Sequence, residues 1–191
     1  MNEKRLETLK RAAESGGPDQ WYELGMYHAL EDRNFDEALV WLKKGADEGH
    51  VKSMNKLWPL YQMLGKPLES MQVLHKLATE HKNPTAMIEM GLMSKAADAG
   101  VETAIELIDA AISTYDDISK ISWQHKVQVG MLYIDLGRHN RAKLQMGVRL
   151  LEDVFENDYE YLKKYQNDER ANEDLKMLLE MGKKQLADFN N

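Results

Sequence analysis

The chain of 191 residues is 43% hydrophobic and carries 32 acidic against 25 basic side chains, for a formal net charge of −7. The hydrophobic content and the presence of only four prolines disfavour global disorder, and the excess of acid argues against a nucleic-acid binder, which needs a basic face. The chain has no cysteine, which excludes disulfides, thiol nucleophiles and thiolate metal sites.

Helix-forming residues dominate, and no alternating β-branched run bounded by turn residues occurs, so the sequence predicts an all-α fold. Residues 1–11 lack the apolar core of a secretory signal. No run approaches the roughly 18 apolar residues of a membrane span. We therefore expect a cytoplasmic protein without a membrane partner.

Residues 3–15 are predicted to form an amphipathic helix, because apolar side chains recur there at helical spacing. Gly16-Gly17 ends this helix, and Pro18 suits the first turn of the next one. We expect helix 3–15 to be an N-terminal cap that covers the open end of the helices that follow.

The first full unit, residues 18–49, holds one predicted helix around 21–27 and a second over 34–46. Its pattern recurs with a step of 33 residues, at Leu24-Gly25, Leu57-Trp58 and Met90-Gly91, at Ala38, Met71 and Ala104, and at Leu42, His75 and Ile108. His75 is therefore expected to be a partly buried packing residue. A fixed period with two amphipathic segments predicts a helical solenoid, because one helix pair cannot bury its apolar face alone.

Three further units follow, at about 50–82, 83–117 and 118–157. The second has predicted helices near 51–64 and 67–81, and Pro59 is expected to bend the first of these or to leave a carbonyl free. After residue 117 the step lengthens, since Gly91 and Gly130 are 39 residues apart.

The tail, residues 158–191, begins with a polar, tyrosine-rich stretch that is expected to be a linker or a short helix. An apolar stripe on one helix follows, at Leu175, Leu179, Gly182, Leu186 and Phe189. We interpret it as a C-terminal cap over the last repeat, and the alternative is a coiled-coil-like seam that forms a homodimer.

The first unit resembles the Sel-one-like repeat family, a branch of the tetratricopeptide-like solenoids. The resemblance rests on four elements: Ala13-Glu14-Ser15-Gly16, Trp21-Tyr22-Glu23-Leu24-Gly25-Met26-Tyr27, Asp36-Glu37-Ala38-Leu39-Val40-Trp41-Leu42 and Gly45-Ala46-Asp47-Glu48-Gly49. Trp58 and Pro59 depart from the pattern in the second unit. The resemblance covers roughly residues 5–156, and it implies a right-handed α-α superhelix of about four helix pairs with capping helices at both ends.

Residues with catalytic or metal-binding spacing are not found. The six histidines are scattered, none stands in a His-Glu-x-x-His arrangement, and no phosphate loop, Gly-x-Ser-x-Gly elbow or dinucleotide fingerprint occurs. The sequence therefore predicts neither catalytic residues, nor a metal site, nor a cofactor.

First helices line the concave side in this family, so one ridge of these helices is the predicted binding surface. It pairs residues one helical turn apart, with polar neighbours at its edge. The candidate residues are Tyr22, Met26, Asn55, Pro59, Gln62, Met63, Ile88, Leu92, Lys95, Val127 and Met131. Its apolar and methionine-rich character suits a surface that adapts to a partner. The alternative is that these residues lie in the interior of a tightly curved superhelix or beneath the C-terminal helix.

The sequence thus predicts a non-enzymatic interaction scaffold that binds a peptide or protein partner in a concave groove. One alternative is a helical enzyme with an unrecognised site, which a perturbed carboxylate or histidine in a deep pocket would favour. Another is an RNA-binding repeat protein, which would need a basic groove.

Overall fold

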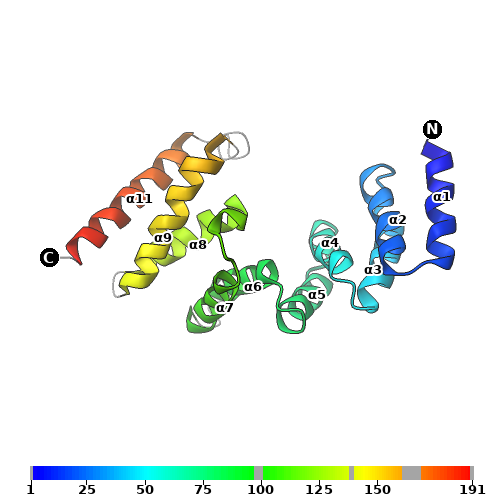
Figure 1. The fold of residues 1–191 in the computed structure, drawn as a ribbon, viewed down its shortest axis with the longest axis horizontal. Coiled ribbons are helices and arrows are strands. Elements are labelled where there is room, and N and C mark those ends of the chain that lie inside the picture. The colour runs from blue at the N-terminus through cyan, green and yellow to red at the C-terminus, as the bar shows by residue number, and fades with distance from the viewer. Residues whose placement is uncertain (1, 97–100, 138–139, 161–168, 190–191) are drawn as a thin grey trace. The chain divides into compact units, whose positions relative to one another are not determined.

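The structure is a computed structural model that describes residues 2–96, 101–137, 140–160 and 169–189 (Figure 1). These residues contain helices and no strand, which confirms the all-α prediction. The first six helices are α1 (Asn2–Ser15), α2 (Pro18–Leu30), α3 (Phe35–Asp47), α4 (Val51–Met63), α5 (Pro67–Thr79) and α6 (Pro84–Ala96). The others are α7 (Val101–Ser113), α8 (Trp123–Leu136), α9 (Arg141–Asp153) and α11 (Glu169–Asp188), with a 3-10 turn η1 (Ile118–Lys120) and a π-helical segment η3 (Val154–Asp158).

The chain divides into two compact units, Met1–Met90 and Gly91–Asn191, and the boundary between them lies inside α6. The predicted division, residues 1–157 and 158–191, rests on another criterion, because it separates the repeats from a capping tail. It stays a prediction. Within the described ranges no helix is both long enough and apolar enough to cross a bilayer.

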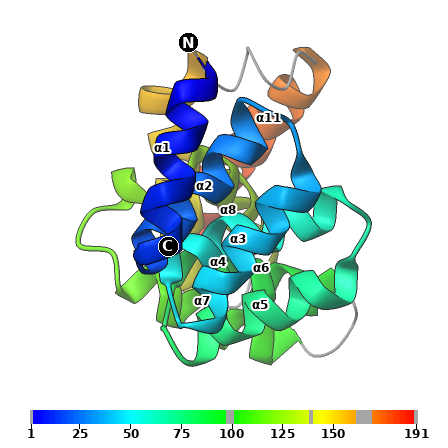
Figure 2. The same cartoon turned by 90° about the vertical axis from the view of Figure 1, so that its right-hand side faces the viewer.

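In the first unit α1 packs against α2, α2 against α3, α3 against α4 and α4 against α5 (Figures 1 and 2). Leu24 of α2 and Leu42 of α3 are fully buried between their helices. The Trp21 indole Nε1 donates a hydrogen bond of 2.9 Å to the Ala13 carbonyl, which ties α2 to α1. Asn34 caps α3 by accepting a hydrogen bond from the Glu37 amide.

Glycines at recurring positions allow the two helices of a hairpin to approach closely. A Cβ on Gly25 would lie 2.8 Å from Leu42 Cγ, and one on Gly91 would lie 2.7 Å from Ile108 Cγ1. A Cβ on Gly130 would lie 2.7 Å from Leu151 Cδ2. Three hairpins therefore share the contact of a first-helix glycine with a branched side chain of the second helix.

In the second hairpin, formed by α4 and α5, Trp58 occupies the position that glycine holds in the other three, and the contact between the two helices is made differently. The facing residue of α5 is the small, fully buried Ser70, whose hydroxyl donates a hydrogen bond of 2.8 Å to the Trp58 carbonyl. The α4 helix continues from Val51 to Met63 through Pro59.

The expectation for His75 is wrong, because α5 is displaced by one residue from the 33-residue step. First helices begin at Pro18, Val51 and Pro84, 33 residues apart, but second helices begin at Phe35, Pro67 and Val101, at steps of 32 and 34. The cause is the α4–α5 turn, residues 64–66, which is one residue shorter than the α2–α3 turn, residues 31–34.

The displacement changes which side chains of α5 enter the core. Ser70 and Leu74 are buried, in the places of Ala38 and Leu42, while Met71 is 52% exposed and His75 is exposed as well.

In the second unit α8 packs on α9, and α11 packs on both. The apolar stripe of α11 faces these helices: Leu175, Leu179 and Gly182 are buried, and Leu186 lies against the same core. Phe189 is 42% exposed. Most of the stripe is thus covered within the chain, by α8 and α9. Much of the polar stretch before it, 161–168, lies outside the described residues.

Candidate interaction surface

The predicted ridge of first helices is only partly exposed in the first unit. Tyr22, Met26, Asn55 and Pro59 are half-buried, and α2 and α4, which carry them, are in contact. Tyr22 also packs edge-on against the His50 ring at a centroid distance of 5.8 Å. At the end of α4 the side chains of Gln62 and Met63 are exposed.

The remaining ridge residues do not form one exposed row. Ile88 is fully buried. Leu92 is half-buried, and Val127 packs against the core formed by α8, α9 and α11. Met131 is 46% exposed, and the side chain of Lys95 lies outside the described residues.

A cleft in the first unit lies between α3 and α5, with α4 beneath it, and we call it the α3–α5 cleft. Its volume is about 640 Å³. The lining residues are Asp36, Leu39, Val40, Lys43, Ala46 and Asp47 of α3, Met54, Leu57 and Tyr61 of α4, Lys66 of the α4–α5 turn, and Glu69, Gln72, Val73 and Lys76 of α5. Apolar side chains form the bottom and three lysines and three acids form the walls, so the cleft combines a hydrophobic bottom with a charged rim.

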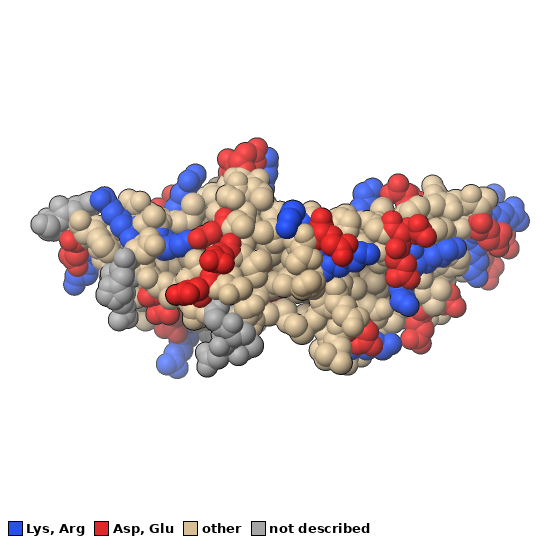
Figure 3. Space-filling model, turned by 90° about the horizontal axis from the view of Figure 1, so that it is seen from below, with Lys and Arg blue, Asp and Glu red and all other residues tan. Residues whose placement is uncertain are grey.

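Electrostatically, the α3–α5 cleft is balanced. Burial raises the pKa of the Tyr61 hydroxyl, and the negative charges of Glu69 and Asp47 raise it further, so this tyrosine stays neutral. Acidic and basic side chains are interspersed on the face of the molecule seen in Figure 3. Such a surface suits a partner with charges of both signs better than a polyanion.

Sequence reasoning missed this cleft, although a signal for it exists in α3. The packed stripe of α3 contains Ala38 and Leu42, yet apolar residues also occupy the neighbouring face at Leu39 and Val40. Val40 is 59% exposed. A second apolar face on a helix whose first face is already packed indicates a further contact.

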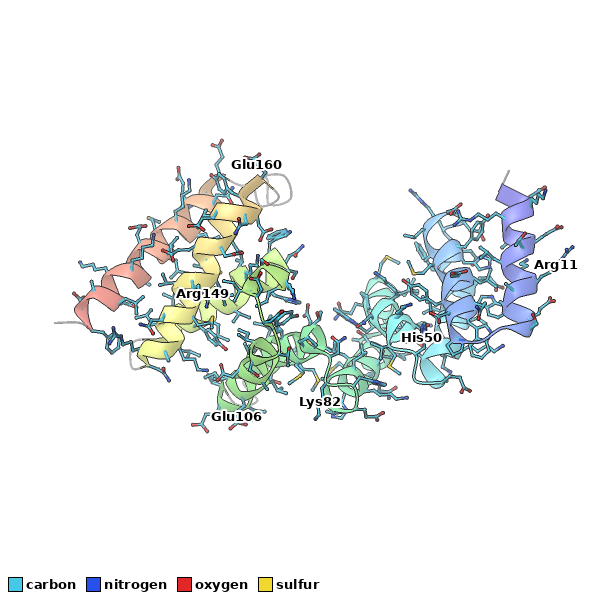
Figure 4. The ribbon with its side chains drawn as sticks, in the orientation of Figure 1. Arg11, His50, Lys82, Glu106, Arg149 and Glu160 are labelled. Atoms are coloured by element: carbon cyan, nitrogen blue, oxygen red, sulfur yellow. The ribbon has the colours of Figure 1, made fainter. Side chains whose placement is uncertain are left out.

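The His50 side chain, just before α4, lies between Ser53 of α4 and Asp19 of α2; His50 is labelled in Figure 4. His50 Nδ1 lies 2.8 Å from Ser53 Oγ, and Nε2 lies 3.3 Å from Asp19 Oδ1. The order of groups resembles a hydrolase triad. However, Ser53 is fully buried, and a Cβ on Gly45 would lie 2.4 Å from its hydroxyl, so a substrate has no access. These contacts tie α2 to α4.

Two ionic clusters of the second unit each include one buried side chain, Lys126 in the first and Tyr133 in the second. Lys126 is 1% exposed and donates hydrogen bonds of 2.5 Å to Asp153 and 2.6 Å to Asp158. Burial alone lowers the pKa of Lys126, but these two hydrogen bonds outweigh burial and hold the pKa above its ordinary value. The cluster links α8 to the end of α9 and to η3.

The other cluster joins three helices. The Tyr133 hydroxyl of α8 donates a hydrogen bond of 2.5 Å to Asp109 of α7, and Lys143 of α9 pairs with the same carboxylate. Burial, and then the hydrogen bond to Asp109, raises the pKa of Tyr133 well above its ordinary value. Its location between helices assigns this cluster to stability.

Among the residues that the structure describes, no group of three or more histidine and carboxylate side chains is placed to hold a metal ion. No protein-family model matches the chain, and no curated protein or solved structure gives a match either.

Proposed function

We propose that the chain is a cytoplasmic interaction scaffold, a Sel-one-like solenoid of the tetratricopeptide-like superfamily, that binds a segment of another protein. The sequential packing of helices and the recurring glycine contacts support a repeat architecture. The observation that carries the binding function is the α3–α5 cleft, because a hollow with an apolar bottom and a charged rim is what a protein segment with a few apolar anchors fills.

The α3–α5 cleft is a better candidate surface than the predicted first-helix ridge. Within the first unit the ridge is half-buried along most of its length, whereas Val40 is well exposed at the cleft. Met131, which is 46% exposed, and Met26, which is half-buried, are the ridge residues used for a comparison.

The test compares two substitutions of one valine each. Val40→Glu places a charge in the α3–α5 cleft, and Val101→Glu places the same charge on α7, where the side chain is 39% exposed. In affinity capture with quantitative mass spectrometry, Val40→Glu should lose a partner that the wild type and Val101→Glu both retain. Thermal melts should shift little for either variant, because both side chains are at the surface.

Met26→Glu and Met131→Glu, examined in the same way, test the ridge. Loss of the partner in these variants alone would move the binding site to the first helices. Retention of every partner by all four variants would contradict the scaffold function.

A further inference from the structure

The α11 helix carries a second stripe of residues on the face that points away from α8 and α9. We call it the outer stripe, and it consists of Arg170, Asp174, Met177, Met181, Lys184 and Asp188. All six residues are exposed, Met177 at 63% and Met181 at 40%. Leu179, midway between the two methionines, lies on the opposite side of the helix and is buried. The outer stripe is therefore distinct from the apolar stripe that packs into the core.

The spacing of the outer stripe is that of a coiled-coil seam. Its residues follow one another at alternating steps of four and three, which is the heptad repeat of the contact positions between two supercoiled helices. The two methionines occupy the middle of the stripe, and charged residues occupy both ends. A helix with this spacing can pack lengthwise against a second helix.

The charges of the outer stripe are inverted about its centre, at position 179. Residues at equal distances before and after this position are either both apolar or opposite in charge. The mirrored pairs are Met177 with Met181, Asp174 with Lys184, and Arg170 with Asp188, at distances of two, five and nine residues from the centre.

This inverted symmetry matches a second copy of the same helix in antiparallel orientation. A two-fold interface brings residue i of one copy to residue j of the other, and residue j to residue i. With the axis at position 179, each Met177 meets Met181 of the other copy, and each Asp174 meets Lys184. The stripe is then complementary to itself, a property that an unrelated partner would not require.

Other arrangements of the two helices are less favourable. In a parallel pair the stripe would bring each residue to its own copy, so that Asp174 would meet Asp174 and Lys184 would meet Lys184. An antiparallel pair shifted by one heptad in either direction would place each methionine against a charged residue. Only the antiparallel register centred on position 179 combines the apolar contact with opposite charges.

Two further acidic residues, Glu173 and Glu180, lie along one edge of the outer stripe. In the antiparallel register Glu173 meets the neutral Ala187, while Glu180 approaches Glu180 of the other copy near the axis. This like-charged contact opposes dimer formation. Its effect is reduced within each chain by Lys183, whose Nζ lies 3.3 Å from Glu180 Oε1. The remaining charges of α11 lie about 100° or more around the helix from the stripe, and they are Glu169, Lys176 and Lys183.

The size of the contact indicates a weak dimer. Each copy contributes two methionines, and the two charge pairs, each occurring twice, are exposed to solvent, where an ion pair adds little free energy. An interface limited to one helix from each copy lies at the small end of specific contacts. We therefore expect a dissociation constant on the order of 100 µM.

We propose that the outer stripe of α11 binds the outer stripe of a second copy of the chain, in an antiparallel two-fold dimer centred on position 179. This inference does not depend on the proposed function as an interaction scaffold, because the stripe lies in the second unit and the α3–α5 cleft lies in the first.

The first test measures the mass of the full chain by sedimentation velocity, from about 10 µM to about 1 mM. The wild type should pass from monomer to dimer over this range. Met177→Glu combined with Met181→Glu should leave a monomer throughout. The matched control is Met63→Glu combined with Met71→Glu in the first unit, where the side chains are 59% and 52% exposed. It should dimerise like the wild type. Circular dichroism melts confirm that both variants are folded.

The second test reverses the charges. Asp174→Lys and Lys184→Asp should each raise Kd about tenfold, because each turns both symmetric contacts from attraction into repulsion. The double variant should dimerise like the wild type, and an equimolar mixture of the two single variants should form a heterodimer in which both contacts are attractive again. Added salt should reduce these differences. Glu180→Gln should lower Kd about threefold, because it removes the like-charged contact near the axis.

The third test determines the direction of the helices. The chain has no cysteine, so one introduced cysteine takes one spin label. In a mixture of labelled Glu173→Cys and labelled Ala187→Cys the two labels should lie close together and broaden the spectrum. Each variant alone should not show this broadening, because its two labels would be separated by 14 residues, about 21 Å along the helix axis. A parallel dimer would give the reverse result.

A chain that stays monomeric at 1 mM, or a dimer that survives Met177→Glu with Met181→Glu, would overturn the inference. Equal losses in the Met63 and Met71 control would overturn it as well, and so would the label distances of a parallel dimer. If the wild type is monomeric but loses a captured protein through the Met177 and Met181 substitutions, the stripe binds that protein and the dimer is wrong. Val40→Glu should leave the dimer intact, so this inference and the scaffold function can fail separately.

Discussion

Two lysines of the second unit have the same number of carboxylate partners but differ in burial. Lys126 is buried with two aspartates within hydrogen-bond distance, whereas Lys183 also contacts two carboxylates, those of Glu152 and Glu180, but is 42% exposed. A buried charge that loses its partner costs far more free energy than a solvated one, because water cannot replace the partner. The same residue type with the same number of partners therefore has different consequences at the two positions.

Lys126→Met should lower the free energy of unfolding by about 3 kcal/mol, because it leaves Asp153 and Asp158 together without a counter-charge. Lys183→Met is the matched control and should cost less than about 1 kcal/mol. Urea titrations followed by circular dichroism measure both. Addition of Asp153→Asn and Asp158→Asn to Lys126→Met should recover much of the loss, and equal costs for the two lysines would contradict the structural role of the buried cluster.

At the scale of helices, the contact of a glycine with a branched side chain sets the distance between the two members of a hairpin. Gly25 faces Leu42, and Gly130 faces Leu151. Alanine would raise intrinsic helix propensity by about 1 kcal/mol at such a position, but its Cβ has no space. Packing therefore outweighs propensity at these glycines.

Gly25→Ala should destabilise the chain by about 1–3 kcal/mol, because the new methyl group would lie 2.8 Å from Leu42 Cγ and force α2 and α3 apart. The effect depends on Leu42, so in a Leu42→Ala background the same substitution should cost less than half as much. Thermal unfolding of the four proteins in this double-mutant cycle measures the coupling. A cost independent of Leu42 would locate the strain elsewhere.

The positions of the helices could be predicted from the sequence, because apolar spacing, glycines and prolines mark them. The register of α5 could not be predicted in the same way. A period of 33 residues fits the first helix of each pair, and only the lengths of the turns reveal that α5 is displaced by one residue. The cleft was missed for a related reason. Val40 and Val73 lie on different helices, and their proximity depends on how α3 and α5 are spaced over α4. The buried role of Lys126 has no local sequence signal, because both partners lie at least 27 residues away.

For the chain as a whole, the two compact units differ in their ionic content. The buried cluster around Lys126 and the hydrogen-bonded Tyr133 both lie within Gly91–Asn191. Both folded-state pKa values lie above the ordinary values of 10.5 and 10.0, so the folded unit holds both protons more tightly than the unfolded chain. Their contribution to stability is complete below the lower ordinary value and is lost as pH rises through the folded-state pKa values.

Alkaline pH should therefore destabilise the second unit, through Lys126 and Tyr133, more than the first, where the pKa of Tyr61 is raised as well, and the loss should begin above about pH 10. Tryptophan fluorescence separates the units, because Trp123 belongs to the second and Trp21, Trp41 and Trp58 to the first. A variant that retains only Trp123 should report an earlier transition in urea at pH 10.5 than at pH 8, while Trp123→Phe should report a smaller change. Tyr133→Phe should reduce the alkaline shift of the Trp123 signal. Identical shifts for both reporters would contradict a larger alkaline loss in the second unit.

The displacement of α5 has a consequence for how such chains change over time. The turn before α5 is one residue short and the turn after it, residues 80–83, is one residue longer than its counterpart at 48–50, so α6 starts where an unshifted copy would start. A deletion and an insertion on opposite sides of one helix have cancelled, and only that helix has slipped along the polypeptide. Copies of this motif are therefore better aligned helix by helix than as rigid blocks, because the connectors absorb the indels while the packing surfaces are preserved.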